Sequence, residues 1–361
     1  MQIIRFIESC LPSGNIKIKM PSFFYDIISL SLLSVFLVFI LSTFSDSNFN
    51  LLIKEFFRPI LKVLTGEYSL FTRVVLKSIP LWLTALTFSI PLKSGYFNIG
   101  GEGQLIISSF TCVWLIHIFS GIYKLTNSLI IFYIFISMLV SIIVGIVWAL
   151  IPYILKRVSQ VNEVITSLVL NYLAVIIIVG ILNYTDIADS NAQGIQSGPI
   201  SSNFLKLVTL NFKTNTISIL APLCFILLIT LSVWLWKTRS GLHLRAVGIN
   251  RKAADIMGLK SQTIIIISIV IAGACAAFGG INNTLTSGRF SIDGLRGLGF
   301  DGIVVAILGK FNASGIIIAS IFLALWYSYD YGLQTSGFPH EISLSAQAIF
   351  LIVFLTRSKK R

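Results

Sequence analysis

The sequence predicts an all-α protein, a polytopic transmembrane helical bundle, and two observations carry that prediction. Of the 361 residues, 55% are hydrophobic and only 11% are charged, whereas a soluble globular domain carries about 25% charged residues. The apolar residues also gather in uncharged stretches near the length of about 20 residues that a membrane helix needs. This composition excludes a soluble enzyme, a disordered chain and a disulfide-stapled secreted domain.

Eight stretches are apolar enough to be membrane segments in their own right. They cover residues 27–45, 78–92, 128–155, 164–185, 214–236, 261–288, 311–329 and 342–356. Two more are ambiguous, because His117 interrupts residues 103–123 and Asp301 lies in the short stretch 297–309. When both are counted as crossings, most basic residues fall on one side. We therefore expect about ten segments, some of them short or broken.

The basic residues predict which side of the membrane each loop faces. A net charge of +13 could indicate nucleic-acid binding, but the Lys and Arg residues lie in short loops, where they report orientation instead. The densest loop, 237–260, holds six basic residues against one acid, Asp255. We expect a single membrane domain over residues 1–361, with this loop and both termini in the cytoplasm and no nucleic-acid partner.

A glycine-rich stretch leads into the segment at 103–123. Four of the ten residues from 95 to 104 are glycine, and each costs a helix about 1 kcal/mol relative to alanine, so we expect non-helical backbone here. A membrane tolerates such backbone only where protein or a watery cavity receives its polar groups. Glu102 is therefore either a solvated residue in an interfacial turn or part of a polar path through the bundle.

Two other apolar stretches carry polar residues. Asp301 lies between glycines, where it is either a helix cap or an intramembrane acid on a substrate path. Asn162 is a candidate helix cap, and Glu163 is suited to the first turn of that helix. Asn171 lies deeper along the same segment and needs a partner inside the bundle.

The basic loop contains a short amphipathic helix near its centre. Asn250 is a suitable N-cap and Gly258 a suitable stop. One face collects apolar residues and the other charged ones, so the helix lies either on lipid head groups or in a groove of a partner protein. The small residues Ala253 and Ala254 favour a close-fitting protein partner.

Signatures of catalysis and of cofactor binding are absent from the sequence. It contains no GxxxxGK[ST] phosphate loop and no HExxH or GxSxG motif. The four cysteines form no CxxC pair, and the three histidines are far apart. We expect no catalytic residue, no metal and no cofactor.

Four of these stretches together resemble a known family. The chain is similar to the permease subunit of bacterial ABC importers of the nucleoside and simple-sugar class, within the branched-chain amino acid and ribose permease superfamily. The resemblance lies in Phe97 to Gln104, Asn162 to Ile165 with Leu170 to Tyr172, Leu244 to Gly258, and Gly299 to Gly309. These stretches follow the family's order within about 75–355, and the first 70 residues match only as a generic leading helix. Gly101 departs from the pattern, because alanine is more usual there.

The resemblance implies an ATP-driven importer of the bacterial cytoplasmic membrane, working by alternating access. Its partners are a cytoplasmic ABC ATPase, a second permease chain that often differs from the first, and an external substrate-binding protein or lipoprotein. The substrate implied is a nucleoside, with a simple sugar such as ribose or galactose as the alternative. The residues implied in ATPase coupling are Arg245, Ala246, Gly248, Asn250, Ala253, Ala254 and Gly258.

The polar residues of the broken segments are the candidates for the substrate pathway. These are Asn98, Glu102, Gln104, Asn171 and Asp301. Neutral polar substrates need hydrogen-bond partners, which favours the amide side chains for direct contact and leaves the two acids to hold the broken helices in place. Two other classes of function stay open: a proton-coupled transporter that needs no ATPase, with Glu102 and Asp301 as its coupling groups, and a membrane-embedded assembly factor.

Overall fold

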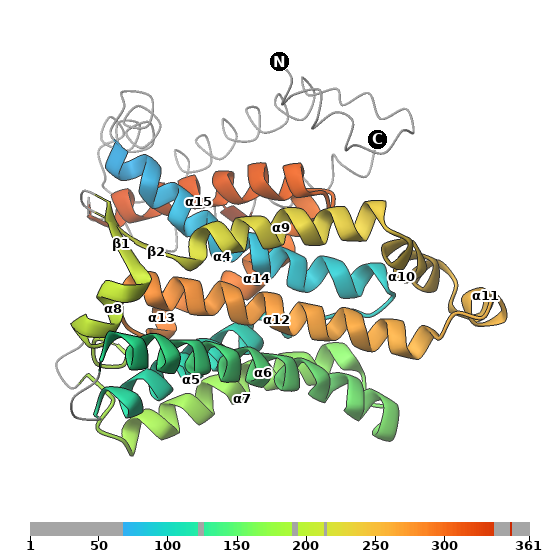
Figure 1. Cartoon of the computed structure of the whole chain (residues 1–361). Helices are drawn as coiled ribbons and strands as arrows, with labels where there is room; N and C mark the ends of the chain where they lie inside the picture. Colours follow the sequence, from blue (N-terminus) through green and yellow to red (C-terminus); the bar gives the residue numbers. More distant parts are fainter. Residues whose placement is uncertain (1–67, 122–125, 190–193, 213–214, 336–346, 349–361) are drawn as a thin grey trace, which may run out of the picture. The chain divides into compact units, whose positions relative to one another are not determined.

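The computed structural model describes residues 68–121, 126–189, 194–212, 215–335 and 347–348 (Figure 1). The spans expected at 27–45 and 342–356 lie outside the described residues, apart from residues 347 and 348. Among those described, Leu76–Ser320 forms one compact unit. Residues 68–75 and the end of helix α15 (Ala313–Thr335) from Ile321 onward belong to a second unit.

The described part of the chain contains six helices that are long and apolar enough to cross a membrane. They are α4 (Tyr68–Lys93, apolar from Thr72), α5 (Gly101–Ser120), α6 (Asn127–Ser159), α7 (Glu163–Asn183), α9 (Leu220–Lys237) and α12 (Ser261–Ser287). This confirms a helical membrane bundle and settles the ambiguous stretch at 103–123 as a helix. The expected total of ten segments is not confirmed.

Two stretches differ from the expected spans. Helix α14 (Leu298–Leu308) has 11 residues and rises about 16 Å at 1.5 Å per residue, roughly half of a 30 Å hydrocarbon core, so it cannot cross a bilayer by itself. The span expected from Thr214 begins only at Leu220, because strand β2 (Asn215–Ser218) pairs antiparallel with β1 (Thr209–Phe212). β-Branched residues in β2 favour this hairpin, which the all-α prediction missed.

Helices α5, α6 and α12 pack together at the centre of the larger unit, and α7 packs on α5 and α6. Residues 101–110 of α5 are all buried, as expected for a helix enclosed by others, and the core around this helix is mainly apolar. Its largest fully buried side chains include Leu105, Phe110, Ile116 and Phe290. At Gly273 a Cβ would lie 2.8 Å from the Gly145 carbonyl oxygen, so small residues set the close approach of α6 and α12.

The connections gather at two ends of the larger unit. Figure 1 shows α8 (Ser202–Val208), β1 and β2 at one end and α10 (Arg239–Ile249) and α11 (Arg251–Ile256) at the other. At the first end, α13 (Ile292–Leu295) and a bridge between Gln196 and Ser291 complete the structure. The second end carries the basic loop at 237–260, which contains α10 and α11.

Candidate functional site

The chain leaves helical geometry between α4 and α5. Gly95 has a φ of +82°, a left-handed conformation that glycine adopts without steric cost, and the Ser94 and Tyr96 amides both bond to the Pro91 carbonyl. Glycines 95 and 100 lie in this connection, as expected, whereas Gly101 and Gly103 already belong to the first turn of α5. The expected break is therefore shorter than the glycine run.

Asn98 holds this connection against α4. Its amide nitrogen donates to the Thr87 carbonyl at 3.2 Å, and its oxygen accepts from the Gly100 amide and from Gln104 Nε2, both at 3.1 Å. Asn98 and Gln104 are 2% and 1% exposed. The two residues therefore form one buried pair, in which Gln104 Oε1 has no hydrogen-bond partner among the described residues.

Asn171 ties the same backbone to α7. Its oxygen accepts from the Gly103 amide at 2.9 Å, and its nitrogen donates to the Ile99 carbonyl at 3.2 Å. The partner expected inside the bundle is thus the backbone at the start of α5. Gly103 permits this contact, because a Cβ there would lie 2.9 Å from the Asn171 oxygen.

Glu102 joins the start of α5 to the start of α14. One carboxylate oxygen accepts from the Gly297 amide at 2.5 Å and the other from the Gly299 amide at 2.7 Å. The N-cap residue of α14 is Gly297, which has no side chain to bind these amides. A carboxylate 195 residues earlier in the chain therefore supplies the cap.

Asp301 lies in the first turn of α14, the place expected for a capping acid. The helix lies against its neighbours through glycines: a Cβ on Gly299 would be 2.5 Å from Glu102 Cα, and one on Gly302 would be 2.5 Å from Thr84 Cβ. We call this meeting of α5, α7 and α14 around residues 98–104 the junction. It brings Asn98, Glu102, Gln104, Asn171 and Asp301 into one region.

Sequence reasoning missed two polar residues beside the junction. Trp148 on α6 and Ser167 on α7 each have a buried polar atom with no partner among the described residues. A Cβ on Gly103 would lie 3.0 Å from Trp148 Nε1, and one on Gly100 would lie 3.6 Å from Ser167 Cβ. Trp148 stands in a long apolar run without a motif, and Ser167 lies in the stretch from Asn162 to Asn171 without carrying a signal of its own.

The α10–α11 segment is partly exposed and carries its own helix caps. The Asn250 side chain accepts from the Ala253 amide at 3.1 Å, and Gly258 has a φ of +83° just after α11 ends. The expected N-cap and stop are confirmed. The apolar side chains of Ile256 and Met257 are 87% and 75% exposed, whereas Ala254 is buried and Ala253 is exposed.

Helix α10 contacts the α4–α5 connection through Gly248. A Cβ on this glycine would overlap the Lys93 carbonyl oxygen and lie 3.1 Å from the Gly95 amide. Arg245 lies over the Trp236 ring, 4.9 Å from its centroid. Ala246 is half-buried on the same helix. The exposed segment is thus in direct contact with the backbone that leads into the junction.

Among the residues that the structure describes, no group of three or more His, Cys, Asp or Glu side chains could hold a metal ion.

Burial raises the pKa of the Tyr96 hydroxyl, and nearby Glu163 and Tyr153 raise it further. This hydroxyl therefore stays protonated and neutral at physiological pH.

The fold and the junction define a class of protein. Spanning helices surround helix N-termini that begin inside the bundle and are held by buried polar side chains, an arrangement typical of membrane transport proteins. The comparison with protein families makes the class specific: a model described as branched-chain amino acid transport system / permease component matches residues 70–355. The chain belongs to this family and is a membrane permease component.

Relatives over most of the chain carry related descriptions. A guanosine ABC transporter permease of Bacillus subtilis is 30% identical over 81% of this chain and 82% of its own length. A nucleoside ABC transporter permease of Lactococcus lactis is 29% identical over 76% of each chain. A glucose ABC transporter permease of Haloferax volcanii is 29% identical over 82% of this chain and 78% of its own. No solved structure matches the chain.

Proposed function

We propose that this chain is the membrane subunit of an ATP-driven nucleoside importer. The observation that carries the proposal is the family match over residues 70–355 together with the nucleoside and guanosine permeases among its relatives. A simple sugar is the second candidate substrate, because a glucose permease is also similar over most of the chain. The chain contains no phosphate loop, so a separate ABC ATPase hydrolyses the ATP.

The ATPase docks on the α10–α11 segment in this proposal. Exposed large apolar side chains are costly in water and typical of surfaces that a partner covers, and Ile249 is 87% exposed, as is Ile256. The segment faces the cytoplasm, as do both termini, because its basic residues favour that side of the bacterial inner membrane. The residues assigned to coupling are Arg245, Ala246, Gly248, Asn250, Ala253, Ala254 and Gly258.

Gly248 is the point at which ATPase motion enters the bundle. A displacement of α10 presses on the backbone at Lys93 and Gly95, because no side chain separates them. That backbone continues into Asn98 and then into Glu102, which holds the start of α14. In this proposal, displacement along this chain of contacts shifts α14 relative to α5. That shift switches the transporter between its outward- and inward-facing states.

The substrate pathway runs beside the junction. Asn98, Gln104 and Asn171 are the proposed contacts for a neutral polar substrate, and Gln104 Oε1 is a buried acceptor without a partner among the described residues. Glu102 and Asp301 support the broken helix starts. A second permease chain, often a different one in importers of this kind, and an external substrate-binding protein complete the transporter.

Purification with partner identification tests the proposal. We expect the tagged chain, extracted from its native membrane in mild detergent, to bring along a P-loop ATPase and a second permease. Reconstituted with these partners and the binding protein, it should take up labelled guanosine only when ATP is hydrolysed. Uptake of glucose without guanosine would select the sugar alternative. Uptake that collapses with an uncoupler while ATP is held constant would overturn ATP coupling.

One substitution separates docking from folding. Ala254 is buried, so a bulky residue there disturbs packing, but Ala253 is exposed and Ala253→Trp alters only the surface of α11. We expect this variant to stay in the membrane and to lose ATPase co-purification. Ser240→Trp, at an exposed position on α10, is the matched control and should retain it. Equal co-purification of both variants would contradict docking at α11.

A further inference from the structure

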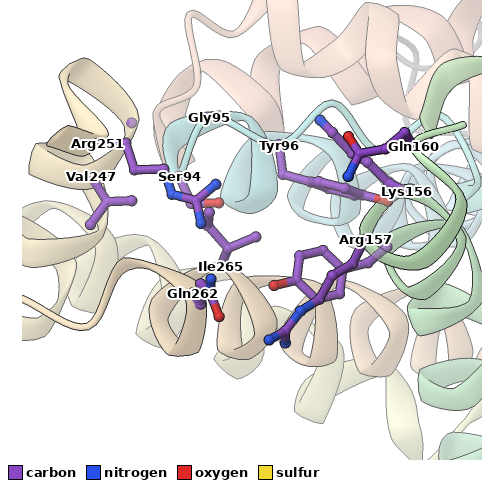
Figure 2. Close-up of a pocket in the computed structure, with 12 residues that line it drawn as sticks. Ser94, Gly95, Tyr96, Lys156, Arg157, Gln160, Val247, Arg251, Gln262 and Ile265 are labelled. Carbon is purple, nitrogen blue, oxygen red and sulfur yellow. The ribbon is translucent and has the colours of Figure 1, made fainter. Parts of the chain in front are cut away.

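A pocket of about 360 Å³ opens where four parts of the larger unit meet (Figure 2). Its volume falls within the range of about 300–1,000 Å³ typical of small-molecule sites. The walls come from the α4–α5 connection, the end of α6, the α10–α11 segment and the start of α12. We call it the basic pocket, lined by Ser94, Gly95, Tyr96, Tyr153, Lys156, Arg157, Gln160, Val247, Gly248, Arg251, Gln262 and Ile265.

The lining contains three cations and no carboxylate. Lys156 bonds to Glu163 at 2.6 Å, outside the lining. Arg157 and Arg251 form no ion pair with any acid in the part of the chain that the structure describes. Figure 2 shows Arg251 extending from α11 toward Ser94, and Arg157 extending from the end of α6 on the other side of the pocket. The pocket therefore holds an excess of positive charge with donors on opposite walls.

Neutral donors accompany these cations. Gln160 and Gln262 are exposed at the rim, and Gln160 is fixed there in a left-handed conformation with a φ of 56°. The Tyr96 side chain is 3% exposed, and its hydroxyl has no hydrogen-bond partner among the described residues. Lys156 Nζ lies 5.8 Å from the centroid of the Tyr96 ring. Cations, amides and an unused hydroxyl are the groups that an anion with several oxygens requires.

The pocket lies at the boundary of the membrane-spanning segments. The spanning part of α4 ends at Lys93, α6 ends at Ser159 and α12 begins at Ser261, and each wall residue lies within about two turns of such an end or in the α10–α11 segment. Phospholipid phosphates lie at this depth, and basic pockets between spanning helices on the cytoplasmic side bind anionic head groups.

We propose that the basic pocket binds a phosphate-bearing anion, presented either by the head group of an anionic phospholipid or by a free phosphate compound. Guanidinium groups match phosphate oxygens in geometry and keep their charge at any physiological pH. A ligand between Arg157 and Arg251 bridges α6 to α11. It therefore fastens the exposed segment to the bundle, so occupancy of the pocket sets how freely that segment moves.

The test measures binding and needs no transport activity, so its failure and the failure of the proposed function are distinguishable. The full chain, purified with the subunits it retains, is exposed to an equal mixture of phosphatidylglycerol and phosphatidylcholine, and bound lipid is counted by native mass spectrometry. We expect selective retention of phosphatidylglycerol. Arg157→Gln and Arg251→Gln should each lower the selectivity about fivefold, the effect expected for one cation near a membrane surface.

Arg239→Gln is the matched control, because Arg239 is an exposed cation of α10 outside the lining, and it should keep the wild-type selectivity. A second arm adds inorganic phosphate to the chain in phosphatidylcholine nanodiscs. Thermal stabilisation by phosphate that Arg157→Gln abolishes would identify a free phosphate compound as the source. The proposal is overturned if neither probe distinguishes Arg157→Gln from Arg239→Gln, or if the pocket variants change only which proteins co-purify.

Discussion

At the junction, the side chains of Asn98, Glu102 and Asn171 are at most 5% exposed and bond to backbone groups in other segments. In α11, by contrast, Ile256 is 87% exposed and the Asn250 side chain bonds to the amide of Ala253, three residues on. The junction is thus stabilised by the rest of the bundle, whereas α11 packs on the bundle through the buried Ala254 and leaves the apolar side chains of Ile256 and Met257 uncovered. Changes at the first site should act on folding, and changes at the second on partner binding.

The largest effect on folding is expected from Gly299→Ala. The new Cβ would lie 2.5 Å from Glu102 Cα, and crowding of this kind typically costs about 1–3 kcal/mol or more. Gly180→Ala on α7 is the control, because a Cβ there meets nothing within 4 Å and removal of a helical glycine is favourable by about 1 kcal/mol. In detergent, the thermal unfolding midpoint should fall for Gly299→Ala and rise for Gly180→Ala. Equal shifts of the midpoint would contradict a close contact between Gly299 and Glu102.

Glu102→Gln is expected to have the next largest effect on stability. An amide side chain keeps one oxygen acceptor, so either the half-buried amide of Gly297 or the buried amide of Gly299 loses its partner, at a cost of about 1–3 kcal/mol. Glu163→Gln tests a carboxylate in a partly exposed pair with Lys156, which should cost about 1 kcal/mol or less. Unfolding midpoints of the two variants compare them directly. A smaller loss for Glu102→Gln would mean that the cap on α14 is dispensable.

Asn250→Ala should weaken the local structure of α11. Loss of an N-cap costs about 1 kcal/mol, and the effect should be confined to this short helix because few contacts tie it to the bundle. Hydrogen exchange should show faster exchange at the Ala253 amide, while amides of α12 stay protected. Equal acceleration in both helices would show that the bundle depends on α11, contrary to the contrast between the two regions.

The smallest effect on stability is expected from Ile256→Ser. Surface substitutions usually change stability by about 0.5 kcal/mol or less, but this one removes an apolar side chain from the proposed docking surface. The unfolding midpoint should stay unchanged while ATPase co-purification falls. A lowered midpoint with normal co-purification would reverse the assignment of Ile256 from docking to packing.

The sequence predicted what depends on local pattern. The long apolar stretches became α6, α7 and α12 with ends close to those expected, and the Asn250 cap and Gly258 stop of α11 are in place. The sequence could not show that the Glu102 carboxylate binds amides 195 residues later, because no local pattern encodes a tertiary contact. It also placed the start of a span at Thr214, whereas residues 215–218 pair with β1 as a strand and the helix begins at Leu220.

The same distinction holds for the candidate site. The sequence predicted the polar residues of the junction as a set. It did not predict that their side chains bond mainly to backbone groups, because those bonds depend on how α4, α7 and α14 pack around them. Trp148 and Ser167 were missed because a single polar side chain carries no motif of its own. The basic pocket was missed because its lining comes from four separate segments of the chain.

We propose that motion of the α10–α11 segment reaches the junction through the contact of Gly248 with the α4–α5 connection. Gly248→Ala tests it most directly, since a Cβ there would lie 2.9 Å from the Lys93 carbonyl carbon and must displace that backbone. In the reconstituted transporter, we expect ATP hydrolysis to continue while guanosine uptake per ATP falls about tenfold, equivalent to about 1.4 kcal/mol of lost coupling. Leu242→Ala, at an exposed position on α10, should leave the ratio unchanged. An unchanged ratio in Gly248→Ala, or an equal fall in both variants, would contradict the claim.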